Sequence, residues 1–210
     1  MGLALNDILD KMCTNNKRFS KDDIAITWIN YKSKNDEVFK GFGCGVNNTK
    51  IIYPASIVKL VYGLAAYYWI KKNRILFTEE INDAVSKMLA YSSNNATSFL
   101  IDLLTGTTSG PCIEGQSWES WKYQRKIIND WLNELNWEEL IGINCCQKTW
   151  DDGPFGRDKE FYGHENNNRN VMTTDSAARV FEEIMIHIDY QENDLNLRSF
   201  LKRNLNKVVL

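Results

Sequence analysis

The stretch YPASIVKLVYGLAAYYWI, residues 53–70, is apolar from Ile57 onward except for one charged residue, Lys59. Its alanines and leucines favour a helix, and Pro54 suits the turn that opens one. A helix that is apolar on all sides is normally buried on all sides. It is also too short to cross a bilayer, which takes about 20 residues. We therefore expect this helix at the centre of a globular domain.

Lys59 is the unusual residue of that helix. Burying an ammonium is costly, and it usually requires a partner or a lowered pKa. Ser56 lies three residues earlier on the same helix face, which places the two Cβ atoms roughly 5–6 Å apart. A buried amine beside a hydroxyl at a helix N-terminus can activate a nucleophile. The alternative is a lysine whose aliphatic stem carries its ammonium to the surface.

The composition is that of an ordinary globular protein. The chain has 210 residues, of which 43% are hydrophobic and 25% charged, with a net charge of −2. This length suffices for one domain with a sizeable core or for two small lobes. No cluster of lysine and arginine stands out, which argues against binding to nucleic acid or to a membrane surface.

The cysteines and histidines suggest a reducing compartment and no metal. The five cysteines include no C-x-x-C pattern, and the N-terminus does not resemble a secretion signal, so we expect free thiols and a cytoplasmic location. Cys145 and Cys146 lie in an apolar stretch and should be buried, unreactive thiols. His164 and His187 are far apart and lack metal-ligand spacing, so neither a metal nor another cofactor is expected.

The residue pattern predicts strands first and helices after. A helix is predicted at 4–13, two hairpin strands at 23–31 and 38–46 around a polar turn at 32–37, and further helices at 79–91, 96–104, 118–135 and 174–188. A long loop is predicted at 146–170, and a last segment covers 197–210. This order predicts an α+β fold in one domain, residues 1–210, with a helical lobe at roughly 55–190.

A second polar cluster occurs in YSSNNATSFLIDLL, residues 91–104, where Ser92 to Asn95 directly precede an apolar segment. Serine and asparagine are preferred N-caps of helices. Capping explains one of these residues well, but it does not explain four in a row. For this segment taken alone, helix capping and a role in chemistry both stay open.

Together, the two clusters resemble a known family. An S-x-x-K motif on a buried helix, followed by S-x-N on a turn, resembles the first two active-site motifs of the serine β-lactamases and penicillin-binding proteins. The segment NRNVMTTDSAARVF, residues 168–181, resembles the end of the omega loop and the helix that follows it. Two further segments look closer to β-lactamase-related serine hydrolases than to the drug-resistance enzymes: TGTTSGP, residues 105–111, and QKTWDDGPFGRDKEF, residues 147–161. The resemblance covers most of residues 20–185 and implies a β-lactamase/transpeptidase-like fold.

The resemblance also implies roles for four residues. Ser56 would be the acylated nucleophile, and Lys59 would take its proton. Ser92 would relay a proton to the leaving group, and Asn94 would hold the amide of the substrate, a β-lactam or a peptide-like amide. Ser93 stands where the family has aspartate, a position whose role there is largely structural.

One departure concerns the carboxylate that activates the deacylating water. Class A β-lactamases place a glutamate in the omega loop for this purpose. Glu160 and Glu165 lie in the corresponding stretch, but neither has the local pattern of the family. Glu160 is the preferred candidate, and a solvated loop carboxylate without function is the alternative.

The other departure is the third family motif, K-T-G, which does not occur in the sequence. Lys148-Thr149-Trp150 shares two letters with it but precedes the omega-loop region. The C-terminal strands of the family would begin about where the sequence stops. We therefore expect a fragment, a natural truncation, or half of an assembly in which a second chain completes the sheet. Two function classes remain: a serine acyl hydrolase, or an inactive remnant that acts as a binding or assembly module.

Overall fold

The structure is a computed structural model that describes residues 1–15, 20–31, 33–34, 37–38, 41–192 and 194–205. Its α-helices are α1 (Gly2–Asn15), α2 (Lys59–Lys71), α3 (Glu79–Tyr91), α4 (Asn94–Thr105), α5 (Gly115–Arg125), α6 (Ile127–Glu134), α7 (Gly156–Tyr162), α8 (Thr174–Glu182) and α9 (Leu197–Leu205). Short 3-10 turns are η1 (Lys21–Asp23), η2 (Ala55–Val58), η3 (Glu138–Leu140) and η4 (His164–Asn166), and η5 (Glu183–His187) is a π-helical turn. The strands are β1 (Ile26–Asn30), β2 (Ser33–Lys34), β3 (Glu37–Val38) and β4 (Phe42–Val46).

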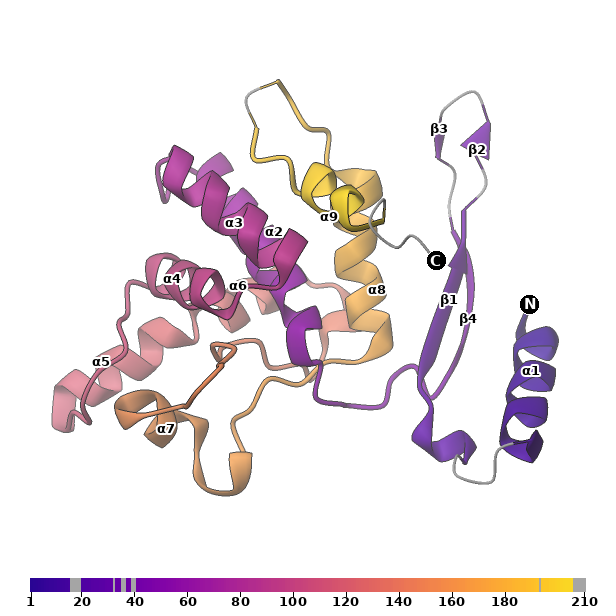
Figure 1. The fold of residues 1–210 in the computed structure, drawn as a ribbon, viewed down its shortest axis with the longest axis horizontal. Coiled ribbons are helices and arrows are strands. Elements are labelled where there is room, and N and C mark those ends of the chain that lie inside the picture. Colours follow the sequence, from indigo (N-terminus) through magenta and orange to yellow (C-terminus); the bar gives the residue numbers. More distant parts are fainter. Residues whose placement is uncertain (16–19, 32, 35–36, 39–40, 193, 206–210) are drawn as a thin grey trace.

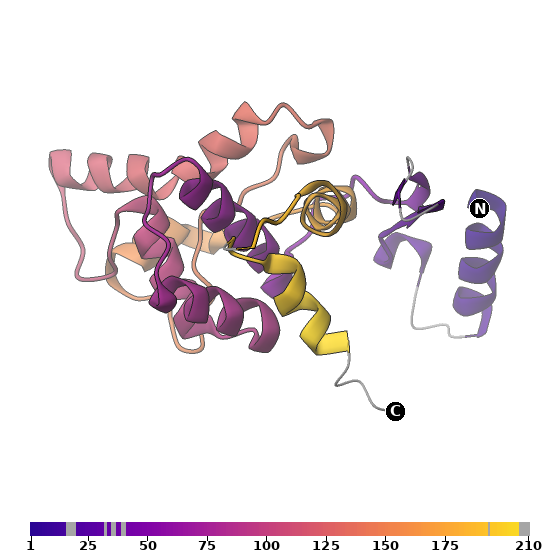
Figure 2. The same ribbon diagram turned by 90° about the horizontal axis from the view of Figure 1, so that it is seen from above.

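Helix α2 lies at the centre of the helical body, as its composition predicts. It contacts α3, α4, α8 and α9 (Figures 1 and 2), and nine of its residues are buried, Lys59 among them. Polar atoms on this helix find partners inside the core. Tyr62 Oη donates to the carbonyl of Gln147 at 2.5 Å, and Trp69 Nε1 donates to the carbonyl of Leu104 at 3.1 Å. These contacts fix the rotation of α2 and therefore the direction in which Lys59 points.

The predicted hairpin is present at one side of the helical body. Strands β1 and β4 pair antiparallel, with Ile26 opposite Val46 and Asn30 opposite Phe42. The hairpin lies between α1 and α8 (Figure 1), and both helices contact it. Within the described residues β1 pairs with β4 alone. A second pair, β2 and β3, occupies part of the predicted polar turn, while residues 32, 35 and 36 of that turn lie outside the described residues.

Several predicted elements have different boundaries, and two predictions are wrong in kind. The predicted helix 118–135 is two helices, α5 and α6, because the chain bends at Lys126. The bend lets α5 pack on a small cluster around Trp121 and Phe161 while α6 packs on the main core. The predicted loop 146–170 contains the short helix α7, which is anchored by the buried Phe161 and Asp158.

The remaining helix predictions agree with the structure to within a few residues. The helix predicted at 79–91 is α3, and the one at 96–104 is α4 with two more residues at its start and one at its end. The segment predicted at 174–188 is α8 continued by η5, and α9 begins the last predicted segment. Residues 206–210 of that segment lie outside the described residues.

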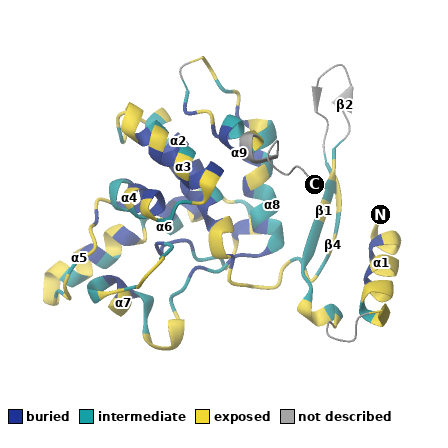
Figure 3. Ribbon diagram, in the orientation of Figure 1, coloured by how far each residue is buried: buried dark blue, intermediate teal, exposed yellow. Residues whose placement is uncertain are grey.

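Burial is coloured in Figure 3, where the dark residues concentrate in the helical body around α2. No helix in the described ranges is both long and apolar enough to span a bilayer. The order of a hairpin followed by helices agrees with the sequence pattern, and assignment to a β-lactamase-like α+β fold stays a prediction.

The packing of α4 predicts a contrast between two adjacent side chains. Leu100 is fully buried, whereas Phe99 keeps 38% of its surface exposed. We expect Leu100→Ala to lower the free energy of unfolding by about 2–5 kcal/mol, because it leaves a cavity that the core cannot fill. Phe99→Ala should cost clearly less. Urea denaturation followed by circular dichroism measures both, and equal losses would contradict the described orientation of α4.

Candidate functional site

Ser56 and Lys59 lie at the N-terminal entry of the central helix, where the sequence places them. Ser56 is in the 3-10 turn η2, with an exposed side chain, and Lys59 is the first residue of α2. Ala55, immediately before the serine, has a φ of 46°, a left-handed conformation that costs a non-glycine residue of order 1–3 kcal/mol. The chain therefore turns sharply to present Ser56 at the surface while Lys59 points inward.

The ammonium of Lys59 is enclosed by oxygen atoms. Only 2% of the residue is exposed, so the alternative of an ammonium extended into solvent is wrong. Its Nζ lies 2.6 Å from the Ser92 carbonyl, 2.7 Å from Asn94 Oδ1, 3.0 Å from Ser92 Oγ and 3.3 Å from Ser56 Oγ. Four acceptors exceed the three hydrogens of an ammonium. The four residues named by the resemblance are thus in one cluster.

The joint between α3 and α4 explains why Ser92 and Asn94 reach the lysine. Ser92 ends α3 in a left-handed conformation, with a φ of 57°. Ser93 then caps α4, and its Oγ accepts a hydrogen bond from the N–H of Ala96 at 3.2 Å. Capping is therefore the role of Ser93 alone. Its neighbours on either side are left to face Lys59.

Burial lowers the pKa of Lys59 from its ordinary value of 10.5, and the negative charge of Asp151 opposes that effect. Desolvation disfavours the protonated amine, because the ammonium loses its hydration, whereas a nearby anion favours it. A lowered pKa raises the fraction of neutral amine at neutral pH. The neutral form is the one that can accept a proton from a hydroxyl.

A carboxylate that sequence analysis did not single out adjoins the cluster. Asn94 Nδ2 donates a hydrogen bond to Asp151 Oδ1 at 2.7 Å. The amide of Asn94 therefore bridges the lysine and an acid, with its oxygen on Lys59 and its nitrogen on Asp151. The only sequence signal is the Asp151–Asp152 pair inside the predicted loop 146–170, and nothing in it distinguishes that pair from solvated loop residues.

Glu160 is the predicted deacylation base. It is exposed on α7, and its side chain makes no hydrogen bond or ion pair within the described part of the chain. Glu165 is also exposed and lies 3.9 Å from the side chain of its neighbour His164. Neither glutamate is brought to the Lys59 cluster by a contact, whereas Asp151 is.

Two further features bear on chemistry, the adjacent cysteines and the possibility of a metal site. Cys145 and Cys146 are buried, as predicted, and burial raises the pKa of the Cys146 thiol to about 12 and raises that of Cys145 as well, which disfavours the reactive thiolate. No group of three or more histidine, cysteine, aspartate or glutamate side chains in the described ranges could hold a metal ion. The Lys59 cluster is the candidate active site.

Comparison with known proteins adds no relative, since no protein-family model and no curated protein matches this sequence. The chemistry of the cluster is accordingly interpreted from its own geometry.

The environment of Lys59 predicts how its pKa responds to substitution. We expect the pKa to lie below 10.5, and Asp151→Asn should lower it further, because removal of an anion disfavours the protonated amine. Trace acetylation with acetic anhydride between pH 7 and 11, read by peptide mass spectrometry against a lysine-amide standard, measures it. Glu160→Gln is the matched control and should leave the value unchanged. A rise in the Asp151→Asn variant would contradict the described contact.

Proposed function

We propose that this protein is a serine acyl hydrolase of the β-lactamase type, which attacks a β-lactam or a peptide-like amide and forms an acyl-Ser56 intermediate. One observation carries the proposal: a buried lysine amine within 3.3 Å of Ser56 Oγ and 3.0 Å of Ser92 Oγ. The five cysteines are free thiols, which fits a reducing compartment, so we place the activity in the cytoplasm.

The contacts of Lys59 support a role as the base in acylation. A neutral amine has two hydrogens and one lone pair. The two shortest contacts, to the Ser92 carbonyl and to Asn94 Oδ1, can take both hydrogens. The lone pair is then free to accept the hydroxyl proton of Ser56, whose Oγ lies 3.3 Å away. As Ser56 Oγ bonds to the substrate carbonyl carbon, its proton passes to Lys59 Nζ, which becomes an ammonium.

Ser92 completes the acylation step. Its Oγ lies 3.0 Å from Lys59 Nζ, so it can give its own proton to the leaving nitrogen while it receives one from the ammonium. The C–N bond breaks, and the acyl group stays on Ser56. The first N–H groups of a helix have no partner within the helix, and Ser56 lies at such an N-terminus. Its N–H is therefore suited to bind the negative oxygen of the tetrahedral intermediate.

Asp151 is the carboxylate that fits hydrolysis of the acyl-enzyme. Asn94 holds one of its oxygens at 2.7 Å, and the side chain is exposed, so water can reach it. As a general base it would take a proton from that water, whose oxygen then attacks the acyl carbon. The bond between that carbon and Ser56 Oγ breaks, and the proton taken from the water returns to Oγ to restore the hydroxyl. We assign this role to Asp151 in place of Glu160. Asn94 has a second N–H that stays available for the substrate amide.

A second candidate function rests on the hairpin. Within the described residues the outer edge of β1 pairs with no strand, and an unpaired edge can accept a strand from another chain. A binding or assembly module that uses this edge would need no acylation. The two functions differ in whether Ser56 reacts.

Acylation is tested by intact-protein mass after incubation with benzylpenicillin. The expected result is a mass gain equal to that of the drug, with no gain for Ser56→Ala. Peptide mapping should place the adduct on residues 55–59. If a sample shown by circular dichroism to be folded gains no mass, the proposal of β-lactam reactivity is wrong, which leaves a different acyl substrate or the binding function.

Deacylation separates the two carboxylates. We expect Asp151→Asn to form the adduct but to hydrolyse it more slowly by a factor on the order of 10²–10⁴, the range of a lost general base. Glu160→Gln should lose the adduct at the parent rate. The decay is followed by mass spectrometry after removal of excess drug. Slow decay in Glu160→Gln instead would return the role to the residue chosen from the sequence.

A further inference from the structure

The loop that carries Asp151 lies alongside α4 and is joined to it at two points. At one, Asp151 accepts from Asn94. At the other, Lys148 Nζ donates to Asp102 Oδ2 at 2.6 Å. Along the helix the two contact positions, Asn94 and Asp102, are eight residues, or about 12 Å, apart. The loop residue that contacts the start of α4 follows the one that contacts its end, so the segment from 148 to 151 runs antiparallel to α4.

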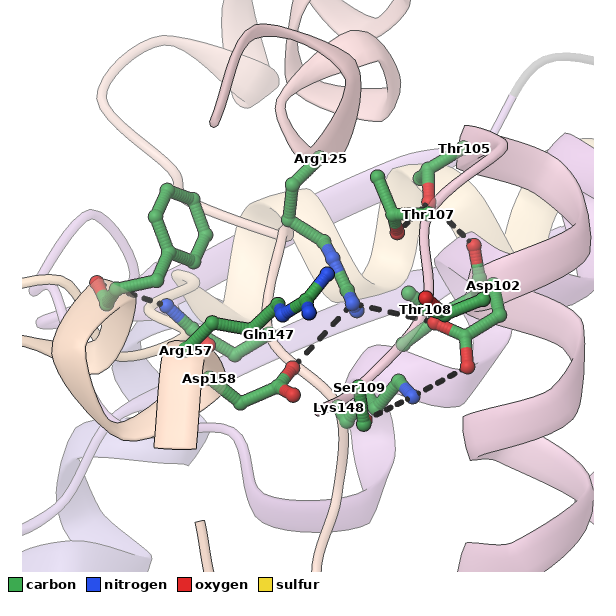
Figure 4. A network of polar contacts seen from close by, with 12 residues as sticks. Asp102, Thr105, Thr107, Thr108, Ser109, Arg125, Gln147, Lys148, Arg157 and Asp158 are labelled. Atoms are coloured by element: carbon green, nitrogen blue, oxygen red, sulfur yellow. Dashed lines mark hydrogen bonds and ion pairs between the residues drawn. The ribbon is translucent and has the colours of Figure 1, made fainter. Parts of the chain in front are cut away.

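The second point of attachment is a buried network of charges, drawn in Figure 4. Lys148 is 3% exposed, and its ammonium also donates to Ser109 Oγ at 2.7 Å. Asp102 Oδ1 lies 3.1 Å from Arg125 Nη2, which lies 3.3 Å from Asp158 Oδ1. The network thus ties α4 and α5 to both sides of the loop, at residue 148 before Asp151 and at residue 158 after it.

The start of the loop is held by contacts between the backbone of Gln147 and the side chain of Asn170. The N–H of Gln147 donates to Asn170 Oδ1 at 2.9 Å, and Asn170 Nδ2 donates to the Gln147 carbonyl at 2.9 Å. Asp151 itself is exposed, and the contact that fixes it among the described residues is the one with Asn94. The nearest hydrogen-bonded attachment of the loop before it is the one at Lys148, three residues earlier.

We propose that Lys148, paired with Asp102, is a positioning residue that holds Asp151 against Asn94 and so sets the charge environment of Lys59. The positioning role rests on the proposed function only where it predicts slower deacylation. A buried ion pair usually adds little stability beyond what apolar side chains of similar volume would give. It does limit the loop to arrangements in which the buried Lys148 ammonium reaches Asp102 and Ser109.

The direction in which the pKa of Lys59 changes distinguishes this positioning role from a direct effect of the Lys148 charge. Lys148→Met removes a cation, and that loss by itself can only raise the pKa of Lys59. If the substitution also releases Asp151 from Asn94, the pKa of Lys59 falls, because the stabilising anion moves away. A fall therefore reports the displacement of Asp151 rather than the lost charge. It can be read by trace acetylation whether or not the protein turns over a substrate.

The experiment compares the parent with Lys148→Met, Asp151→Asn and the double variant. We expect Lys148→Met to lower the pKa of Lys59 by roughly half or more of the Asp151→Asn shift. The double variant should match Asp151→Asn, because Lys148 acts on Lys59 through Asp151 and the two shifts are therefore not additive. Ser109→Ala, which removes one hydrogen bond of Lys148 and no charge, should give a smaller fall and serves if Lys148→Met does not fold.

An unchanged or raised pKa of Lys59 in the folded Lys148→Met protein, or in Ser109→Ala if that is the variant that folds, would overturn the proposal. Additive shifts in the double variant would do the same. The adduct assay separates this failure from that of the proposed function. Where the parent acylates and deacylates, Lys148→Met should form the adduct and slow its decay as Asp151→Asn does. A parent that forms no adduct refutes β-lactam reactivity and leaves the acetylation result to decide the positioning role.

Discussion

The enclosed ammonium of Lys59 is the constraint on which the candidate site depends. An amine with 2% exposure has to find its hydrogen-bond partners inside the protein, because an unpartnered buried charge is far too costly. The partners come from the joint of α3 and α4, 33 and 35 residues further along the chain. The lysine thereby fixes how those two helices meet the entry of α2, and the same contacts gather Ser56, Ser92 and Asn94 around one nitrogen.

Helix α4 extends this constraint to a second buried cation. Its first residue, Asn94, accepts from Lys59, and Asp102 near its end accepts from Lys148. Both lysines have a pKa lowered mainly by burial, and a carboxylate opposes the effect in each case. One helix thus places an oxygen ligand at each of two buried amines. The loop joins both ends of this helix, since Lys148 contacts Asp102 and Asp151 contacts Asn94.

Sequence analysis anticipated the parts of the site that local patterns encode. An apolar helix with a single lysine, and a hydroxyl one turn before it, depend on residues close together in the chain. The hairpin and the amphipathic helix α3 follow from periodicities of two and 3.6 residues in the same way. Asp151 could not be found like this, because its contact with Asn94 joins residues 57 positions apart. The sequence favours Glu160 because it lies in the right stretch, but within the described residues no hydrogen bond or ion pair joins its side chain to the cluster.

The bend between α5 and α6 and the short helix α7 were missed for a related reason. The apolar spacing from 118 to 135 fits one helix, and only the presence of two separate apolar clusters requires a bend at Lys126. Helix α7 has seven residues, too few for a periodic pattern to stand out. It is held by the ion pair of Asp158 with Arg125. Tertiary contacts, rather than helix propensity, decide both elements.

The costs gathered at the Lys59 cluster favour a chemical role over a structural one. Ala55 and Ser92 both have left-handed backbones, each a source of strain. A lysine whose pKa is lower in the folded than in the unfolded chain destabilises the fold while both states are protonated, and this penalty disappears only as pH rises through the folded and then the unfolded pKa. At neutral pH the penalty is in force. Three unfavourable features within one small cluster, beside an exposed serine, are expected where geometry and charge serve a reaction.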